Sequence, residues 1–313
     1  MELRKDYILN RWVIIAESRK LRPRQFTSEQ NIKSDATCYF CPGHEDLTPP
    51  ETGRVQEGPH WKLRWFPNLY GVASANGSPE VRTDNSFYTF GSSYGYHEII
   101  AETPDHSRQI YDLSESELAL LFSVYRERIR DLGSLPNISY VSLFKNHGKE
   151  GGASLVHSHT QLIATSFFPP QVQEELDAVA RYDSCPYCRI IQGEKDSARR
   201  CFESEHFIAF TPYASRFNYE IILLAKGHIR TMEEIDDPLL DELATMAKKI
   251  LSKIAGLNAS FNFFIHYSPA GKDLHFHLEF LPRIAILAGF EYCSGVVINS
   301  VSPETAAAYY RGE

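Results

Sequence analysis

The sequence lacks a hydrophobic run long enough to cross a membrane, because no window of the 313 residues approaches the length of about eighteen apolar residues that a spanning helix requires. The opening residues, MELRKDYILNRW, also lack the apolar core of a secretory signal peptide. We therefore expect a cytoplasmic protein without a transmembrane segment.

Basic residues are too few to give the chain a positive charge. There are 32 Lys and Arg against 40 Asp and Glu, so the formal net charge is -8. A general nucleic-acid binder depends on an excess of basic residues, so we do not expect that class. An anionic substrate would have to be met by a local basic group. With 43% hydrophobic and 23% charged residues, the chain has the composition of an ordinary soluble globular protein of two domains or one large one.

Cysteine is scarce, yet four of the six cysteines form two CxxC pairs, Cys38 with Cys41 and Cys185 with Cys188. In a reducing compartment such pairs indicate metal or redox chemistry before structural disulfides. A thioredoxin-like redox pair would open a helix, whereas we expect each of these pairs to lie in a proline-containing loop. Redox use is therefore the less favoured role, and buried cysteines without a ligand are a further alternative.

The most informative stretch is Asn146–Gln161, NHGKEGGASLVHSHTQ. It follows Ile138–Phe144, whose β-branched and aromatic residues are typical of a strand, so the glycines fall where a strand ends. In an extended backbone His157, His159 and Gln161 share one face. Histidines beside a glycine loop that allows close backbone approach suit an anionic phosphorus centre. The alternative is a pair of exposed or hydrogen-bonded histidines on an ordinary strand.

The two halves of the sequence repeat one order of features: a CxxC pair, a strand with Glu-Ile-Ile followed by a histidine, a capped helix, another strand and an HxH motif. The Glu-Ile-Ile elements are Glu98–His106 and Glu220–His228, and the second HxH is His275–His277. The separation from the lone histidine to the HxH motif is 51 residues in the first half and 47 in the second. A duplicated α+β unit is the economical explanation.

Periodicity and capping residues predict the elements of this unit. We expect helices at 114–133, 171–181, 237–256 and 303–310, the third of them capped by Asp237. We expect strands at 11–16, 61–66, 97–102, 138–144, 207–210, 219–225, 261–266 and 274–281. The prolines Pro169 and Pro170 mark the boundary between an N-terminal catalytic domain, residues 1–170, and a C-terminal structural domain, residues 171–313.

Each half also supplies two cysteines and two histidines as possible metal ligands. The two sets are Cys38, Cys41, His106 and His157, and Cys185, Cys188, His228 and His275. A Cys2His2 shell is a standard tetrahedral zinc site, so we expect about two zinc ions per chain. Four protein ligands would close each site and leave no position for a metal-bound hydroxide, so both ions would be structural.

His159 is then the candidate nucleophile, because a neutral imidazole attacks phosphorus without a base to activate it and a zinc-bound His157 would fix its direction. These residues fit transfer of a phosphorus-centred group through a covalent link to histidine. Gln161, on the same face, can bond a phosphate oxygen. The other residues expected to hold substrate are Asn146, Gly152 and Ser154, with Arg19 and Arg22 as sources of positive charge. An exposed basic turn is the alternative interpretation of the two arginines.

The second half differs at the residues that would bind phosphate. It has His277 at the nucleophile's position, but Glu279 stands where the first half has Gln161, and the glycine loop is missing. A carboxylate at this position would repel a phosphate. We therefore expect a catalytically silent second half in which His277 is packed or hydrogen-bonded.

These motifs resemble the galactose-1-phosphate uridylyltransferase family, of the histidine-triad superfamily, over nearly the whole chain. The matching positions are Arg19, Arg22, Cys38, Cys41, His106, Asn146, Gly152, Ser154, His157, His159 and Gln161. The resemblance implies two tandem histidine-triad-like α+β domains, each an antiparallel sheet with packed helices, and commonly a homodimer. It also implies zinc on the first Cys2His2 set, a nucleotide-binding role for Asn68, and a nucleotidyl group carried by His159.

Two departures from the usual family pattern concern the substrate. Ser158 stands where the family often has proline, and no lysine precedes Gly289–Glu291. Together with Cys185 and Cys188, these features are more similar to the ADP-glucose phosphorylase branch, whose members move adenylyl groups to phosphate. Glu291 is a candidate acceptor-site residue.

The main hypothesis is a nucleotidylyltransferase that moves a nucleoside monophosphate from a nucleotide sugar, of UDP-hexose or ADP-glucose type, to a hexose-1-phosphate or phosphate. Adenylyl transfer from ADP-glucose to phosphate is the alternative within this class. A second hypothesis is a hydrolase of dinucleoside polyphosphates or nucleotide phosphoramidates, from which Gln161, in place of a third histidine, distinguishes this chain. A third is a zinc-stabilised nucleotide-binding module without turnover. The base, the acceptor and the oligomeric state stay open.

Overall fold

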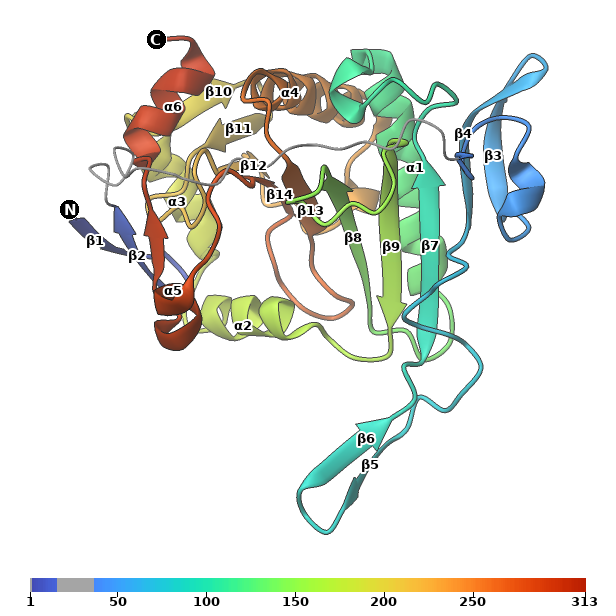
Figure 1. The fold of residues 1–313 in the computed structure, drawn as a ribbon. Coiled ribbons are helices and arrows are strands. Elements are labelled where there is room, and N and C mark those ends of the chain that lie inside the picture. The colour runs from blue at the N-terminus through green and yellow to red at the C-terminus, as the bar shows by residue number, and fades with distance from the viewer. Residues whose placement is uncertain (1, 16–36) are drawn as a thin grey trace.

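The computed structural model describes residues 2–15 and 37–313 (Figure 1). Its main feature is a ten-stranded antiparallel sheet. The strands are β3 (Gly53–Glu57), β4 (His60–Pro67), β7 (Gly95–Ala101), β8 (Tyr140–His147), β9 (His159–Thr165), β10 (Arg200–Glu203), β11 (Phe207–Phe210), β12 (Ile221–Ala225), β13 (Phe261–His266) and β14 (His277–Pro282). Their order across the sheet is β10-β11-β12-β14-β13-β8-β9-β7-β4-β3.

This strand order repeats about the centre of the sheet. The two middle strands, β8 and β13, run antiparallel with Phe144 opposite Phe264. From there outward β9 matches β14, β7 matches β12, β4 matches β11 and β3 matches β10. In both halves the strand after the HxH motif begins at its second histidine, His159 or His277. The predicted α+β fold with duplicated antiparallel units is confirmed, and the two units share one continuous sheet.

Two long helices, α1 (Glu115–Gly133) and α4 (Asp237–Gly256), pack against each other over the sheet (Figure 1). Helix α1 begins as predicted, with a capping box between Ser114 and Glu117. The remaining helices are α2 (Pro170–Val179), α3 (Pro186–Glu194), α5 (Gly289–Ser294) and α6 (Pro303–Arg311), with 3₁₀ turns at Glu45–Leu47, Ile110–Asp112 and Met232–Glu234. None of the helices in the described part of the chain combines the length and the apolar character that crossing a bilayer requires.

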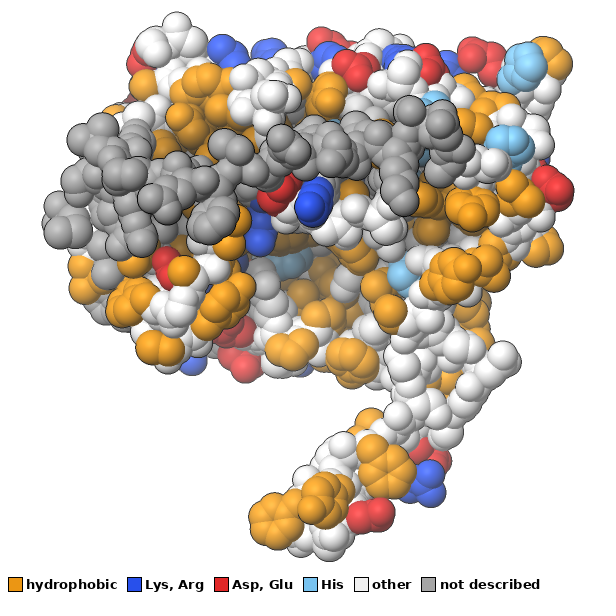
Figure 2. Space-filling view, viewed as in Figure 1, with side chains coloured by type: hydrophobic (Ala, Val, Ile, Leu, Met, Phe, Trp, Pro, Cys, Tyr) orange, Lys and Arg blue, Asp and Glu red, His pale blue; other side chains and the backbone are white. Residues whose placement is uncertain are grey.

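Smaller elements complete the fold. The strands β1 (Glu2–Lys5), β2 (Trp12–Ile15) and β15 (Val297–Asn299) form a three-stranded sheet that joins the two ends of the chain. A hairpin of β5 (Val81–Asp84) and β6 (Tyr88–Gly91) projects from the body and exposes apolar side chains (Figures 1 and 2). No strand was predicted between residues 66 and 97, so this hairpin was missed.

Two local predictions were wrong. The side chain of Asp236, and not that of Asp237, caps α4 by accepting a hydrogen bond from the Leu239 N–H at 3.0 Å. The second CxxC pair opens a helix, because Cys185 is the N-cap of α3 and Pro186 follows in its first turn. Proline fits there because the first N–H groups of a helix have no partner within the helix. The position of Cys185 and Cys188 therefore gives no evidence against redox use of this pair.

The two faces of the sheet have different surroundings. Ile100 belongs to the large core under the helices, whereas Ile99 and Ala101 pack with Phe40 and Phe66 in a smaller cluster. Because successive side chains of a strand point to opposite faces, this smaller cluster lies on the face away from α1. The Cys38–Cys41 loop is thereby brought onto the same face as the first HxH motif.

Candidate active site and metal centres

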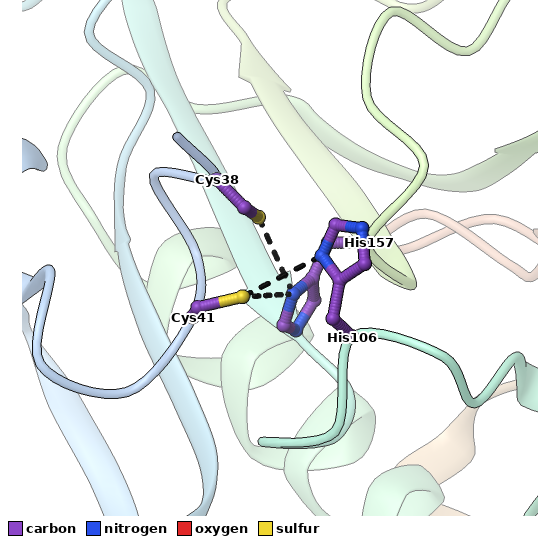
Figure 3. A group of neighbouring side chains, drawn as sticks. All are labelled: Cys38, Cys41, His106 and His157. Carbon is purple, nitrogen blue, oxygen red and sulfur yellow. Dashed lines mark hydrogen bonds between the residues drawn. The ribbon is translucent and has the colours of Figure 1, made fainter. Parts of the chain in front are cut away.

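The structure brings the four predicted ligands of the first half together, and their side chains point toward one another (Figure 3). The ligand atoms all lie within 4.8 Å of one another. The Nδ1 atom of His157 is 3.5 Å from the Cys38 sulfur and 3.6 Å from the Cys41 sulfur. The Nδ1 atom of His106 is 3.5 Å from the Cys41 sulfur. This set of residues can hold a metal ion.

The chemistry of this group fits zinc. His157 is fully buried and donates a hydrogen bond from Nε2 to the backbone carbonyl of Thr103 at 2.7 Å, so Nδ1 carries the lone pair that faces the sulfurs. Burial, and then the hydrogen bond with Cys38, raise the pKa of Cys41 to about 11. A thiol with so high a pKa becomes a thiolate only with a strong neighbouring cation, and two thiolates with two imidazoles are typical zinc ligands.

The second predicted set forms the same arrangement. The Nδ1 atom of His275 is 3.6 Å from the Cys185 sulfur and 3.7 Å from the Cys188 sulfur, and that of His228 is 3.6 Å from the Cys188 sulfur. His275 donates from Nε2 to the Ala225 carbonyl at 2.8 Å, which repeats the bond of His157 to Thr103. Both predicted sets therefore assemble as groups able to hold a metal.

His159 follows the first metal group directly and is 5% exposed. It donates a hydrogen bond from Nδ1 to the backbone carbonyl of His157 at 2.8 Å, which leaves the lone pair on Nε2. Burial, and then the positive charge of Lys145, lower the pKa of His159 to about 4. Its imidazole is therefore neutral near pH 7, as a nucleophile must be. The Phe40 ring packs edge-on against it, with 5.4 Å between the centroids.

Gln161, a predicted catalytic residue that would bond a phosphate oxygen, and Asn68, predicted to bind the nucleotide, meet at a histidine that was not predicted from the sequence. The Nε2 atom of His97 lies 3.0 Å from Gln161 Oε1 and 3.2 Å from Asn68 Nδ2. His97 accepts from the Val72 N–H at Nδ1, so Nε2 carries the proton and donates to the Gln161 oxygen. This bond turns the Gln161 amide so that its NH2 group is the part left to meet an oxygen of a ligand.

The internal repeat could not reveal His97, because the second half has Tyr219 at the matching position. The available signal was its place two residues before Ile99 on the same face of a strand. A polar side chain on that otherwise apolar face is a candidate partner for residues of the site.

The glycine loop is held against the second half of the sheet. A side chain on Gly151 would bring its Cβ to 2.3 Å from the His147 carbonyl oxygen, so only glycine fits at position 151. Asn262 of β13 donates from Nδ2 to the Gly151 carbonyl at 2.7 Å and to Asn146 Oδ1 at 2.8 Å. Asn146 is therefore anchored across the centre of the sheet.

The other predicted residues of the loop have different surroundings. Gly152 has a φ of +82° and donates its N–H to the Lys149 carbonyl at 3.0 Å. Its N–H is therefore not free to bond a ligand, and its contribution to a site would be the space left by a missing side chain. Ser154 is exposed. Arg19 and Arg22 lie outside the described residues.

Glu291 lies on α5, beside β15 and distant from the HxH end of β9 (Figure 1). Its carboxylate accepts a hydrogen bond from the Ala288 N–H at 3.0 Å. In the described ranges, no hydrogen bond links it to His159, Gln161 or Asn68.

The counterpart of the site in the second half is filled by charged side chains. His277 is 1% exposed, and its Nε2 has no hydrogen-bond partner among the described residues and lies 3.7 Å from Glu279 Oε1. Glu279 accepts a hydrogen bond from Arg216 at 2.5 Å. Glu175 and His266 complete a third group of possible metal ligands, which the sequence analysis did not foresee. The cavity beside this group holds about 60 Å³, far below the several hundred Å³ of typical ligand pockets.

Comparison with known proteins identifies the class to which this fold and site belong. Residues 2–169 match the family model of the galactose-1-phosphate uridyl transferase N-terminal domain. Residues 184–282 match the model named scavenger mRNA decapping enzyme C-term binding. The chain belongs to the galactose-1-phosphate uridylyltransferase family, and the prediction of an enzyme of nucleotidyl transfer is confirmed at that level.

Individual relatives narrow the comparison. The chain is 34% identical to ADP-glucose phosphorylase from Arabidopsis thaliana, over 99% of this chain and 92% of that protein. It is 28% identical to galactose-1-phosphate uridylyltransferase from Thermotoga maritima, over 99% and 98% of the two chains. A crystal structure of an Arabidopsis thaliana ADP-glucose phosphorylase with bound ADP-glucose superimposes with a TM-score of 0.87, covering 100% of this chain and 98% of that one, at 33% identity.

Proposed function

We propose that this chain is a nucleotidylyltransferase in which Nε2 of His159 attacks the nucleotide phosphorus of a nucleotide sugar. The P–N bond forms as the bond from that phosphorus to the bridging oxygen breaks, and the sugar phosphate leaves with the electron pair. The oxygen of a second phosphate then attacks the same phosphorus and returns the imidazole. The observation that carries the proposal is the hydrogen bond from His159 Nδ1 to the His157 carbonyl, which leaves the lone pair of a neutral ring on Nε2.

The neighbouring residues have supporting roles in this proposal. The Gln161 amide, oriented by His97, donates to a phosphate oxygen on which charge develops. Asn68, at the same histidine, contacts the nucleotide. Asn146, Gly152 and Ser154 line the approach to the phosphates, with Arg19 and Arg22 as sources of positive charge, and Glu291 serves the acceptor.

The two Cys2His2 groups would each hold one zinc ion, giving about two per chain. When bound, zinc would hold the first HxH motif against the Cys38–Cys41 loop. The chain's own residues carry out the transfer, because four protein ligands close each shell.

Two donor and acceptor pairs are candidates. ADP-glucose with phosphate is supported by the resemblance to ADP-glucose phosphorylase over nearly the full length of both proteins. A UDP-hexose with a hexose-1-phosphate is supported by the family match and by the Thermotoga maritima relative.

A panel of reactions distinguishes these substrates. The purified protein is mixed with ADP-glucose and phosphate, or with UDP-glucose and galactose-1-phosphate, and the products are measured. Release of ADP and glucose-1-phosphate identifies the first pair, and exchange of the hexose phosphates identifies the second. Release of the nucleoside monophosphate without an acceptor would instead indicate a hydrolase. Binding of nucleotide without any product would indicate a module without turnover, and either result would refute the transferase.

The wider organisation of the protein is also proposed. We infer a catalytic domain at residues 1–170 and a structural domain at 171–313, since the filled second site leaves no room for a nucleotide. We further propose a homodimer in the cytoplasm, where thiols stay reduced for metal binding. Light scattering of the purified protein tests the dimer, and a monomer at all concentrations would contradict it.

A further inference from the structure

A buried ion pair lies directly behind the two histidines of the first HxH motif. Lys145 of β8 is 1% exposed and Glu102, which follows β7, is 2% exposed. Lys145 Nζ donates to Glu102 Oε2 at 2.7 Å, to Ser158 Oγ at 3.0 Å and to the backbone carbonyl of His159 at 2.9 Å. The hydroxyls of Ser158 and Thr160 donate to the Glu102 carboxylate. The pair thus binds the HxH segment at three consecutive residues.

This network lies on the face of the sheet that α1 covers. Ser158 and Thr160 alternate with His159 along the chain and so point to the opposite side. The hydroxyl of Tyr125, from α1, is 2.6 Å from Thr160 Oγ1 and 3.2 Å from Glu102 Oε1. Glu102 and Lys145 therefore lie on the side of the sheet away from a ligand at His159, and they contact the HxH segment through its backbone and through the hydroxyls of Ser158 and Thr160.

The second half of the chain builds the same structure at this point without the charges. The repeat and the strand register match Leu224 to Glu102, Ile265 to Lys145, Phe276 to Ser158 and Leu278 to Thr160. All four of these apolar side chains are at most 1% exposed. His275 and His277 nevertheless make the same backbone hydrogen bonds as their counterparts, each at 2.8 Å. The metal group and the HxH backbone therefore do not require the ion pair.

Stability does not explain why the first half has these charges. A buried ion pair usually adds no more stability than apolar residues of similar volume, because both ions lose their hydration. Its restriction to the half that has the glycine loop and Gln161 indicates a role in the reaction. Charge-assisted hydrogen bonds are shorter and stronger than neutral ones, and they restrain the backbone that they join more tightly than apolar packing does.

We propose that Glu102 and Lys145 are positioning residues, which hold the Ser158–His159 backbone so that the His159 ring keeps its attacking orientation while the P–N bond forms and breaks. The proposal rests on the proposed function of His159. A displacement of a reacting group by about 1 Å can slow a reaction by roughly a hundredfold, so a rigid support for the nucleophile has a measurable effect.

The test exchanges the pair for the residues of the second half. In the double variant E102L/K145I we expect a folded protein with the metal content of the wild type. Its single-turnover rate of nucleotidyl-histidine formation should fall by roughly ten- to a hundredfold, while the donor concentration at half-maximal rate changes by less than about twofold. A merely structural role would not lower the single-turnover rate while leaving the half-saturating donor concentration nearly unchanged.

Two further variants keep the result interpretable. Ile265→Val alters the buried core at the position that matches Lys145 and should leave the adduct rate unchanged. Ser158→Ala removes one contact of the network, should slow adduct formation by about tenfold, and decides the matter if the double variant does not fold. A wild-type rate in Ser158→Ala, or in a folded E102L/K145I, overturns the positioning role. Absence of any adduct in the wild type would instead refute the proposed function.

Discussion

His157 donates a hydrogen bond from Nε2 to the backbone carbonyl of Thr103 at 2.7 Å, and this bond turns its Nδ1 toward the two cysteine sulfurs. The backbone carbonyl of His157 accepts in turn from Nδ1 of His159 at 2.8 Å. One residue therefore joins the candidate metal ligands to the proposed nucleophile. The Thr103 carbonyl sets the direction of the His157 ring, and the direction of the His159 ring depends on the backbone of His157.

The first prediction follows from this link. Cys41→Ser should remove one metal ion per chain and slow adduct formation by roughly ten- to a hundredfold, because the support of His157 is lost. Cys188→Ser, the matched change in the second half, should also remove one metal ion but leave the adduct rate within about twofold. Elemental analysis measures the metal content of the two variants, and single-turnover mass measurements give their rates of adduct formation, both below the unfolding temperature. Equal loss of rate in both variants would contradict separate roles for the two metal groups.

The second prediction concerns pH. Burial and the charge of Lys145 lower the pKa of His159 to about 4, from an ordinary value of about 6.5, so its neutral form persists well below pH 7. Adduct formation should therefore be nearly constant between about pH 5 and 8 and fall only as the pH approaches 4. Single-turnover rates, with metal content measured at each pH, test this. A pH profile of adduct formation with its midpoint near pH 6.5, with the metal retained, would show that the pKa of His159 is not lowered.

The same shift affects stability. The folded protein binds the His159 proton more weakly than the unfolded chain does. The free energy of unfolding therefore decreases as the pH falls from the pKa of the unfolded chain to that of the folded protein. The contribution of His159 is fully present above about pH 6.5 and is lost as the pH falls toward 4, by about 3 kcal/mol at most. Urea unfolding of wild type and His159→Asn across this range should show the wild type losing more stability on acidification, and equal losses would contradict the shift.

A third prediction tests the glycine loop. Gly151→Ala would place a Cβ 2.3 Å from the His147 carbonyl oxygen and 2.8 Å from that of Phe261, so the backbone must move. We expect a loss of about 1–3 kcal/mol in the free energy of unfolding, together with slower adduct formation. Gly193→Ala, at an exposed helical position with no atom within 4 Å of the new Cβ, should stabilise by up to about 1 kcal/mol. Unfolding in urea measures the free energy of unfolding of both variants. Equal effects would show that the loop can accommodate a Cβ at position 151.

A fourth prediction concerns the third residue of HxHxQ. Gln161→Glu gives the first half the carboxylate that the second half has at Glu279. A negative charge beside the transferred phosphate should slow adduct formation by roughly a hundredfold or more without loss of metal. Gln56→Glu, the same chemical change on the exposed side of β3, should have no effect. A rate for Gln161→Glu close to that of the wild type would show that Gln161 does not contact the transferred phosphate.

Much of this architecture could be predicted from the sequence because it depends on local patterns. The two ligand sets, the capping box at Ser114 and the duplicated α+β unit followed from spacing and repetition, whereas the antiparallel pairing was implied by the resemblance to the family. The single continuous sheet could not be predicted in the same way. It depends on pairing between β8 and β13, whose partners are more than a hundred residues apart.

Side-chain partners across the fold were also hidden from the sequence. His97 meets Gln161 only because β7 and β9 are adjacent, and Lys145 meets Glu102 only because β9, between their strands, brings them together. Neither pair has a counterpart in the second half, so the repeat gave no signal. The helix at Cys185 was missed because proline was taken as a loop residue, although it also fits the first turn of a helix.

The most direct test of the central claim is the mass of the protein after mixing with ADP-glucose and, separately, with UDP-glucose, followed by peptide mapping. We predict one nucleotidyl group per chain on His159 with at least one donor, none in His159→Asn, and an unchanged adduct in His277→Asn. Absence of an adduct with both donors in a protein that retains its metal ions, or an adduct on a residue other than His159, would contradict it.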